Sequence, residues 1–131
     1  MSTVRAYEFF CDRVVHEYFH AVDNGNMDAA LACFHPQALL REMTSGTEHR
    51  GRDEGIRRML TDFCAAHERI WHGNFVLTVD PDNESVAVQF SVEVTPTGGA
   101  LMRYENCNRF YLEQGLFREV YIYMSGDNLL R

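Results

Sequence analysis

Apolar residues in the first half of the chain recur at helical spacing. Tyr7, Cys11, Val14, Tyr18 and Val22 follow one another at steps of four and three, which lines up one apolar face of a helix. Asn26 has the side chain to cap a second helix, and a proline follows that helix. The predicted helices span residues 4–22, 27–34 and 53–66.

The pattern changes to a period of two in the second half of the chain. Between residues 86 and 95 apolar and smaller or polar residues alternate, which is typical of a strand with one buried face. Turn residues separate this segment from its neighbours. The predicted strands span 38–43, 75–79, 86–95, 100–112 and 116–124. Helices followed by consecutive strands predict an α+β domain, with the helices on one face of a strongly curved, mostly antiparallel sheet and a conical cavity between the layers.

Composition supports one globular domain over residues 1–131. Hydrophobic residues make up 46% of the sequence, and 19 acidic residues outnumber 12 arginines for a net charge of −7. This charge disfavours nucleic acid or an anionic membrane surface as a partner, and no apolar run is long enough to span a membrane. The beginning of the sequence is not that of a secretory signal, and the cysteines are widely spaced, so we expect reduced thiols and a cytoplasmic location.

The last predicted strand is apolar on both faces. Val120, Ile122 and Met124 alternate with Tyr121 and Tyr123. One face can pack on the helices, and a strand apolar on both faces is usually covered on both. We therefore expect a homodimer that forms through the outer face of the sheet.

Three segments resemble one known superfamily. They are the helix junction at 21–28 (AVDNGNMD), the approach to the first strand at 34–38 (FHPQA) and the helix start at 51–56 (GRDEGI). Together with the element order they resemble the nuclear transport factor 2-like (NTF2-like) superfamily, and within it the SnoaL-like proteins and ketosteroid isomerases. The resemblance implies the cystatin-like cone fold over nearly the whole chain. It does not fix the reaction, because the superfamily contains isomerases, cyclases, dehydratases and non-catalytic binding modules.

The resemblance also implies candidate site residues. Counting from Gly25 places Tyr18 where ketosteroid isomerases have a tyrosine that donates to the oxyanion. Counting from Phe34 places Glu42 at the position of the catalytic carboxylate. A second donor, an aspartate in the isomerases, corresponds to Asn106 or to Cys107, depending on the anchor. In SnoaL-like relatives and dehydratases a histidine near His72 can face the cavity, where it would act as acid or base near neutral pH.

Proton transfer next to a carbonyl needs a base and fixed hydrogen-bond donors. Glu42 is in phase with the apolar Ala38 and Leu40, so we expect it to face inward, where burial would raise its pKa and strengthen it as a base. Tyr18 and Asn106 would then stabilise the enolate oxygen. The alternative interpretations are a solvent-facing Glu42, a core tyrosine, an exposed asparagine and a strand-edge histidine.

No cofactor or metal is expected. His16 and His20 are spaced i, i+4 but no third ligand accompanies them, and no nucleotide-binding or hydrolase motif is present. Arginines near residue 52 alternate with acids, which favours a solvated mixed-charge face over a phosphate site. Two hypotheses remain. One is a cofactor-independent isomerase, cyclase or dehydratase that acts on a small apolar carbonyl compound, and the other is a non-catalytic dimeric module that binds a ligand or serves as a scaffold.

Overall fold

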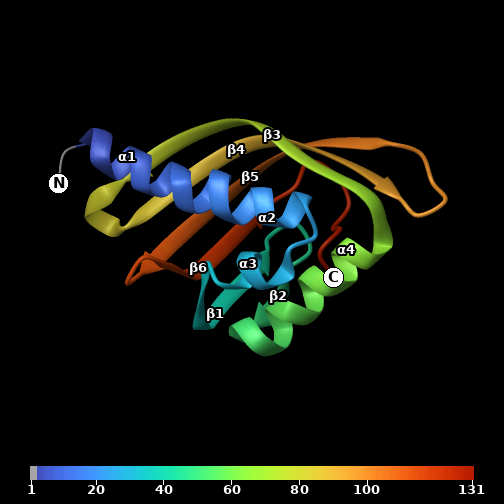
Figure 1. Ribbon diagram of the computed structural model, residues 1–131, viewed down its shortest axis with the longest axis horizontal. Coiled ribbons are helices and arrows are strands. Elements are labelled where there is room, and N and C mark those ends of the chain that lie inside the picture. Colours follow the sequence, from blue (N-terminus) through green and yellow to red (C-terminus); the bar gives the residue numbers. More distant parts are fainter. Residues whose placement is uncertain (1–2) are drawn as a thin grey trace.

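A computed structural model describes the backbone of residues 3–131 and the side chains from Ala6 onward. Six strands form one curled sheet in the order β2-β1-β6-β5-β4-β3 (Figure 1). All neighbouring strands are antiparallel except β1 and β6, which are parallel. The strands are β1 (Phe34–Glu42), β2 (Thr47–Arg50), β3 (His67–Asp80), β4 (Ser85–Pro96), β5 (Met102–Glu113) and β6 (Leu116–Tyr123). The α+β class and the mostly antiparallel sheet are confirmed.

The first predicted helix is confirmed as one rod with a change of winding. Its middle part, η1 (Asp12–Phe19), is a π-helix between α1 (Thr3–Cys11) and α2 (His20–Asp23). Tyr18 and Phe19, adjacent in the π-helical part, are both buried in the core. The other helical segments are α3 (Met27–Leu31) and η2 (Gly51–Ile56), which continues into α4 (Arg57–Ala66).

The region after the first rod differs from the sequence prediction. Asn26 caps α3 as predicted, because its Oδ1 accepts a hydrogen bond from the Ala29 backbone N–H at 3.2 Å. However, α3 ends at Leu31, and Pro36 lies inside β1 instead of beyond a helix end. The pairing of β1 with β6 is irregular between Phe34 and Leu39. A proline has no N–H to donate to the ladder, so an irregular stretch is where a strand tolerates it.

Two strand predictions also needed correction. The short strand β2 was not predicted, because four residues with the sequence TEHR carry almost no periodic signal. β3 begins at His67, well before the predicted start at residue 75. Its pairing with β4 shifts between Gly73 and Val76, and Asn74 in that gap has a φ of 55°, so a bulge interrupts the alternation that the prediction relied on.

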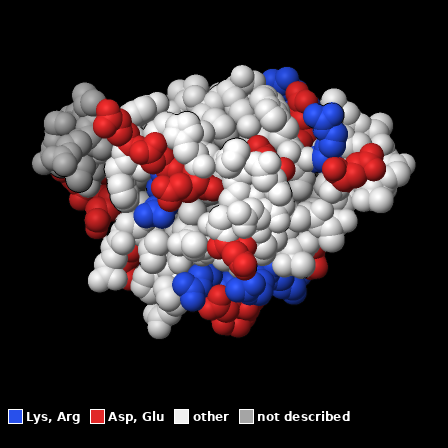
Figure 2. Space-filling view, viewed as in Figure 1, with Lys and Arg blue, Asp and Glu red and all other residues white. Residues whose placement is uncertain are grey.

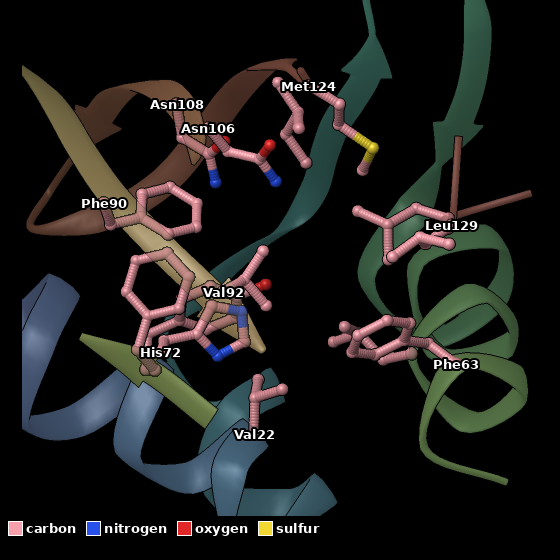
Figure 3. A pocket seen from close by; sticks show the side chains of 14 residues that line it. Val22, Phe63, His72, Phe90, Val92, Asn106, Asn108, Met124 and Leu129 are labelled. Atoms are coloured by element: carbon pink, nitrogen blue, oxygen red, sulfur yellow. The ribbon is translucent and has the colours of Figure 1, made fainter. Parts of the chain in front are cut away.

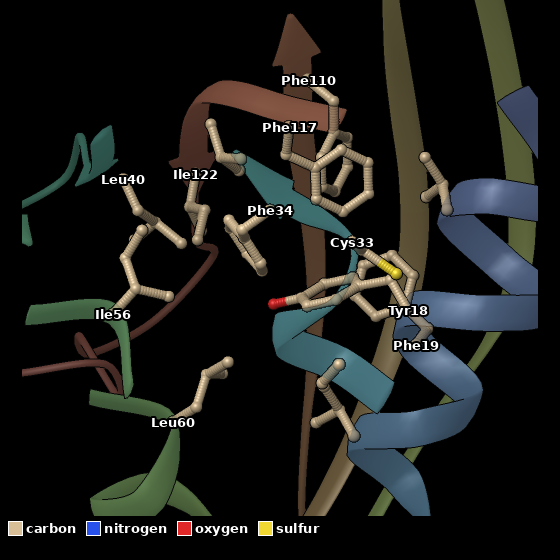
Figure 4. Packing of buried hydrophobic residues seen from close by; sticks show 14 of the residues in the cluster. Tyr18, Phe19, Cys33, Phe34, Leu40, Ile56, Leu60, Phe110, Phe117 and Ile122 are labelled. Atoms are coloured by element: carbon tan, nitrogen blue, oxygen red, sulfur yellow. The ribbon is translucent and has the colours of Figure 1, made fainter. Parts of the chain in front are cut away.

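The core lies between the helices and the concave face of the sheet. Phe34, Phe110 and Phe117 are completely buried and pack on one another and on Tyr18 with ring centroids 4.6–6.1 Å apart (Figure 4). Figure 1 shows the helical rod and α4 on the same side of the sheet. The C-terminal part of the rod and α4 contribute side chains to the cavity described next.

Candidate functional site

A largely apolar cavity lies between the helices and the sheet (Figure 3). Side chains of the first rod, α4, four strands and the segment after β6 surround it. Its free volume is about 40 Å³, which suits a few water molecules but is far below the roughly 300 Å³ of small pockets for drug-sized ligands. The lining residues are Tyr18, Phe19, Val22, Leu60, Phe63, His72, Phe90, Val92, Asn106, Asn108, Ile122, Met124, Leu129 and Leu130.

His72 and Asp23 form a hydrogen-bonded pair at the cavity wall. His72 Nδ1 lies 2.6 Å from Asp23 Oδ1, and the His72 backbone N–H donates to Asp23 Oδ2 at 3.0 Å. The imidazole packs against the rings of Phe19 and Phe90, at centroid distances of 4.6 and 5.6 Å. A carboxylate only accepts, so Nδ1 carries the proton and Nε2 keeps a free lone pair when the ring is neutral. The pair therefore holds a base in one tautomer and orientation.

Two asparagines of β5 face the same cavity from the opposite wall. Asn106 and Asn108 are both buried, and their amide nitrogens point toward the cavity on the side of His72 (Figure 3). Asn106 Oδ1 accepts a hydrogen bond from the Ser125 backbone N–H at 3.2 Å, which fixes its amide with the nitrogen free to donate. Asn106 lines the cavity and Cys107 does not. Of the two residues that sequence counting left open, Asn106 is the one that faces the cavity, and its role as a donor stays a prediction.

Tyr18 lies on the cavity wall formed by the first rod. Burial raises the pKa of its hydroxyl, and the nearby thiols of Cys33 and Cys64 add to the rise. The phenol is therefore a neutral donor over the physiological pH range. Its oxygen points away from the rod into the space between Phe34 and Leu60 (Figure 4). This is the position expected of a donor to a ligand, and equally of a core tyrosine.

Glu42 is buried as predicted, but its carboxylate does not line the cavity. Oε1 accepts from the Thr44 N–H at 2.6 Å, and Oε2 accepts from the N–H and hydroxyl of Ser45 at 3.0 and 2.6 Å. Burial pushes the pKa of Glu42 upward, but these hydrogen bonds outweigh it and lower the pKa. The expected rise in pKa is therefore wrong. The role of Glu42 as a base stays a prediction.

The remaining candidates do not build a second site. Among residues 3–131 no group of three His, Cys, Asp or Glu side chains could hold a metal ion. Arg52 and Arg57 pair with Asp53, and Arg58 pairs with Asp62, so the mixed-charge face is confirmed (Figure 2). In the same part of the chain no helix has the length and apolarity needed to cross a membrane. The four cysteines are free.

Comparison with known proteins identifies the family. The model of the SnoaL-like domain matches residues 15–120, which is most of the chain. The chain belongs to the SnoaL-like domain family. No curated protein matches this SnoaL-like sequence.

Solved structures support the same fold. The chain is 21% identical to SalBIII, an epoxide hydrolase/cyclase-like enzyme of pyran ring formation in the polyether salinomycin, with a TM-score of 0.77 over 93% of this chain and 92% of that one. It is 20% identical to a Xanthomonas campestris pv. campestris protein with a provisional polyketide cyclase name (TM-score 0.76, 96% and 92% covered). It is 10% identical to an NTF2-like protein from Anabaena variabilis (TM-score 0.80, 97% and 94% covered). At sequence identities of 10–21% the similarity to these structures establishes the fold alone.

Sequence reasoning found three of the four polar residues that line the cavity of this SnoaL-like chain, and it missed Asn108 and also Asp23, which pairs with His72 from outside the lining. Tyr18, His72 and Asn106 share one cavity, whereas Glu42 lies outside its lining. Asp23 was missed because 49 positions separate it from His72. Asn108 was missed although it has the strand phase of Asn106, and that shared phase was the signal that could have identified it.

Proposed function

We propose that this SnoaL-like protein is a cofactor-independent enzyme that moves a proton next to the carbonyl of a small apolar ligand. The His72–Asp23 pair in an apolar cavity carries the proposal. His72 Nε2 would take the proton from the carbon next to the carbonyl, and Asp23 would stabilise the resulting imidazolium. Isomerisation, aldol closure and dehydration all share this enolate step.

The enolate oxygen needs hydrogen-bond donors that are already in place. Asn106 supports this role, because its oxygen is occupied by Ser125 and its nitrogen points into the cavity. Tyr18 supports it as a neutral phenol on a second wall. Donors held by the fold stabilise developing charge without the reorganisation that water would require.

The test is exchange of the α-protons of 1-tetralone and 2-tetralone in D₂O, followed by proton NMR. We expect the wild-type protein to accelerate exchange and His72→Gln to abolish the acceleration. Asp23→Asn should lower it about 100-fold or more, because the imidazolium loses its counter-charge. His20→Gln, an exposed histidine on the same rod, is the matched control and should match wild type. Equal exchange by wild type and His72→Gln would favour the non-catalytic module.

We also propose that the protein is a homodimer through the outer face of the sheet. That face presents aromatic side chains: Tyr111 and Tyr121 pack edge to face at 5.9 Å, Arg109 lies over Tyr111, and Tyr123 is 51% exposed. Native mass spectrometry should give twice the chain mass for wild type, and Tyr121→Glu with Tyr123→Glu should give the monomer. A monomeric wild type at micromolar concentration would refute this proposal.

A further inference from the structure

Asn108 is a buried polar residue that nothing in the fold requires. It is 3% exposed and sits on the concave face of β5, where its register neighbours Val88 and Ile122 are apolar. Its Oδ1 is fully buried and has no hydrogen-bond partner among the described residues. Buried amides that serve the fold are almost always hydrogen-bonded, so the fold does not explain Asn108. The orphaned oxygen is an acceptor that points away from the cavity, and the atom that faces the cavity is the amide nitrogen, so a ligand would meet Asn108 as a hydrogen-bond donor (Figure 3).

The neighbouring Asn106 indicates the hydrogen-bonding chemistry of that ligand. Asn106 and Asn108 are two positions apart on one strand, so their side chains leave the same face about 7 Å apart at the backbone. Both amide nitrogens point into the cavity and toward the same wall (Figure 3). Two convergent N–H donors bind one oxygen acceptor well, and they bind it better as its negative charge grows.

We propose that Asn108 is a second oxyanion donor, which with Asn106 holds the carbonyl oxygen of the ligand. This inference rests on the proposed function for its reaction, but not for its ligand chemistry. Asn108 is then a catalytic residue in direct contact with substrate. The ligand class is one with a single strong acceptor oxygen at the polar end of an otherwise apolar body.

The infrared carbonyl stretch of bound 1-tetralone tests the contact without any chemistry. Each donor to the oxygen lowers the stretching frequency, so we expect Asn108→Leu and Asn106→Leu each to move the band part of the way back toward its position in an apolar solvent. His20→Gln, a change at an exposed residue outside the lining, should leave the wild-type band unchanged. An unchanged band in Asn108→Leu would overturn the inference while leaving the His72 proposal standing.

The unfolding temperature and the rate of α-proton exchange together distinguish a ligand contact of Asn108 from a structural role. In the free protein Asn108→Leu should unfold at the same temperature as wild type or higher, because no hydrogen bond is lost, whereas Asn106→Leu should unfold at a lower temperature because it leaves the Ser125 N–H without its acceptor. Asn108→Leu should lower α-proton exchange about 100-fold. A lower unfolding temperature for Asn108→Leu would assign it to the fold instead.

An independent observation concerns residues 125–131, which follow β6 and close the cavity. Leu129 and Leu130 line it, and the segment lies beside α4 (Figure 1). The buried Asn128 donates from Nδ2 to Ser45 Oγ at 3.0 Å and to Thr47 Oγ1 at 3.3 Å. Ser45 is the residue whose hydroxyl is held by Glu42. A free volume of about 40 Å³ leaves no room for a tetralone while these contacts persist.

A second contact holds the same segment. His49 Nε2 lies 2.6 Å from the Leu130 carbonyl oxygen, so this nitrogen donates. We infer that segment 125–131 is a gate, that the Asn128 and His49 contacts are its latch, and that Glu42 is a positioning residue that orients Ser45 for the latch. Ligand enters when the latch opens.

Stopped-flow binding of 1-naphthol, an enol-like probe that reports by fluorescence, tests the gate. Asn128→Ala should raise the association rate constant about fivefold or more, and Asp127→Ala, an exposed neighbour, should leave it unchanged. On the wild-type protein, hydrogen exchange should show the Leu130 amide, which donates to Asn128 Oδ1, opening more often than the Phe117 amide of the core. Equal association rates for wild type and Asn128→Ala, or equal protection of these two amides, would overturn the gate.

Discussion

Replacing Glu42 by glutamine decides whether this acid is a catalytic base or a structural clamp, that is, a carboxylate whose hydrogen bonds hold the turn at Thr44 and Ser45. The carboxylate accepts three hydrogen bonds, from the Thr44 N–H and from the N–H and hydroxyl of Ser45. A glutamine amide has one acceptor oxygen, so its NH₂ group must face at least one of these donors. The loss of one charge-assisted bond costs about 1.5–3 kcal/mol, and a donor left unpaired adds to it. We therefore expect a total loss of about 2–4 kcal/mol.

That loss corresponds to a fall in Tm of roughly 8–15 °C for a domain of this size, measured by circular dichroism at pH 7. Glu68→Gln is the matched control, because Glu68 is exposed on the surface, and its Tm should change by less than about 2 °C. If Glu42→Gln also stays within 2 °C of wild type, the hydrogen bonds do not hold the turn and the clamp is refuted.

The pH dependence of the stability difference between wild type and Glu42→Gln is an independent test. The folded-state pKa of Glu42 is lowered, so its ionised form stabilises the fold above the unfolded pKa of about 4.3, and this contribution is lost as the pH falls toward the folded pKa. The stability gap between wild type and Glu42→Gln should be constant from pH 8 to 6 and should shrink below about pH 4.3. A gap that widens on acidification would contradict the lowered pKa. If Glu42 is not the base, folded Glu42→Gln should retain α-proton exchange, whereas loss of a catalytic base would abolish it.

Three further substitutions test the frame that holds the site. Gly55→Ala should cost more than about 2 kcal/mol in urea unfolding, because an added Cβ would lie 2.7 Å from the backbone N and O of Arg50; a neutral result would mean that the η2 turn is not this close. Asn26→Ala should cost about 1 kcal/mol, since the cap on the Ala29 N–H is lost, and an unchanged midpoint would show that the cap is unimportant. Phe110→Ala should cost about 3–5 kcal/mol by emptying the centre of the core, and a cost below 1 kcal/mol would mean that the core collapses around it.

Much of the fold could be predicted from the sequence because one buried face leaves a periodic signal. β4 is the clearest case, since its even-numbered valines and Phe90 are buried and the predicted strand 86–95 matches Ser85–Pro96 within one residue at each end. The parallel pairing of β1 with β6 could not be predicted this way. Periodicity reports which face of a strand is buried, but not which strand lies beside it.

Site residues could be predicted from the sequence only where they lie in phase with the buried positions of their helix or strand. Tyr18 follows the apolar stripe of the first rod, and Asn106 lies on the inward phase of β5. Glu42 also follows the inward phase, yet its carboxylate accepts hydrogen bonds from Thr44 and Ser45 in the turn after β1, a local contact that strand phase does not describe. Asp23 depends on packing between α2 and β3, which are distant in sequence.

The energetics of the cavity favour a ligand-binding protein over a scaffold with a filled core. A scaffold gains stability when its interior is apolar, and each buried amide without its full set of hydrogen bonds costs about 1–3 kcal/mol. In this fold Asn108 Oδ1 has no hydrogen-bond partner among the described residues. Asp23 contacts only one ring nitrogen of His72, Nδ1, so Nε2 remains available. Both residues belong to the lining of the same cavity, opposite each other, and not to separate parts of the core. A carbonyl compound that enters past segment 125–131 would offer its oxygen to the amide and its adjacent C–H to the imidazole. The groups that face the cavity without a partner in the fold, the Asn108 amide nitrogen and His72 Nε2, are thus the ones that the proposed reaction needs.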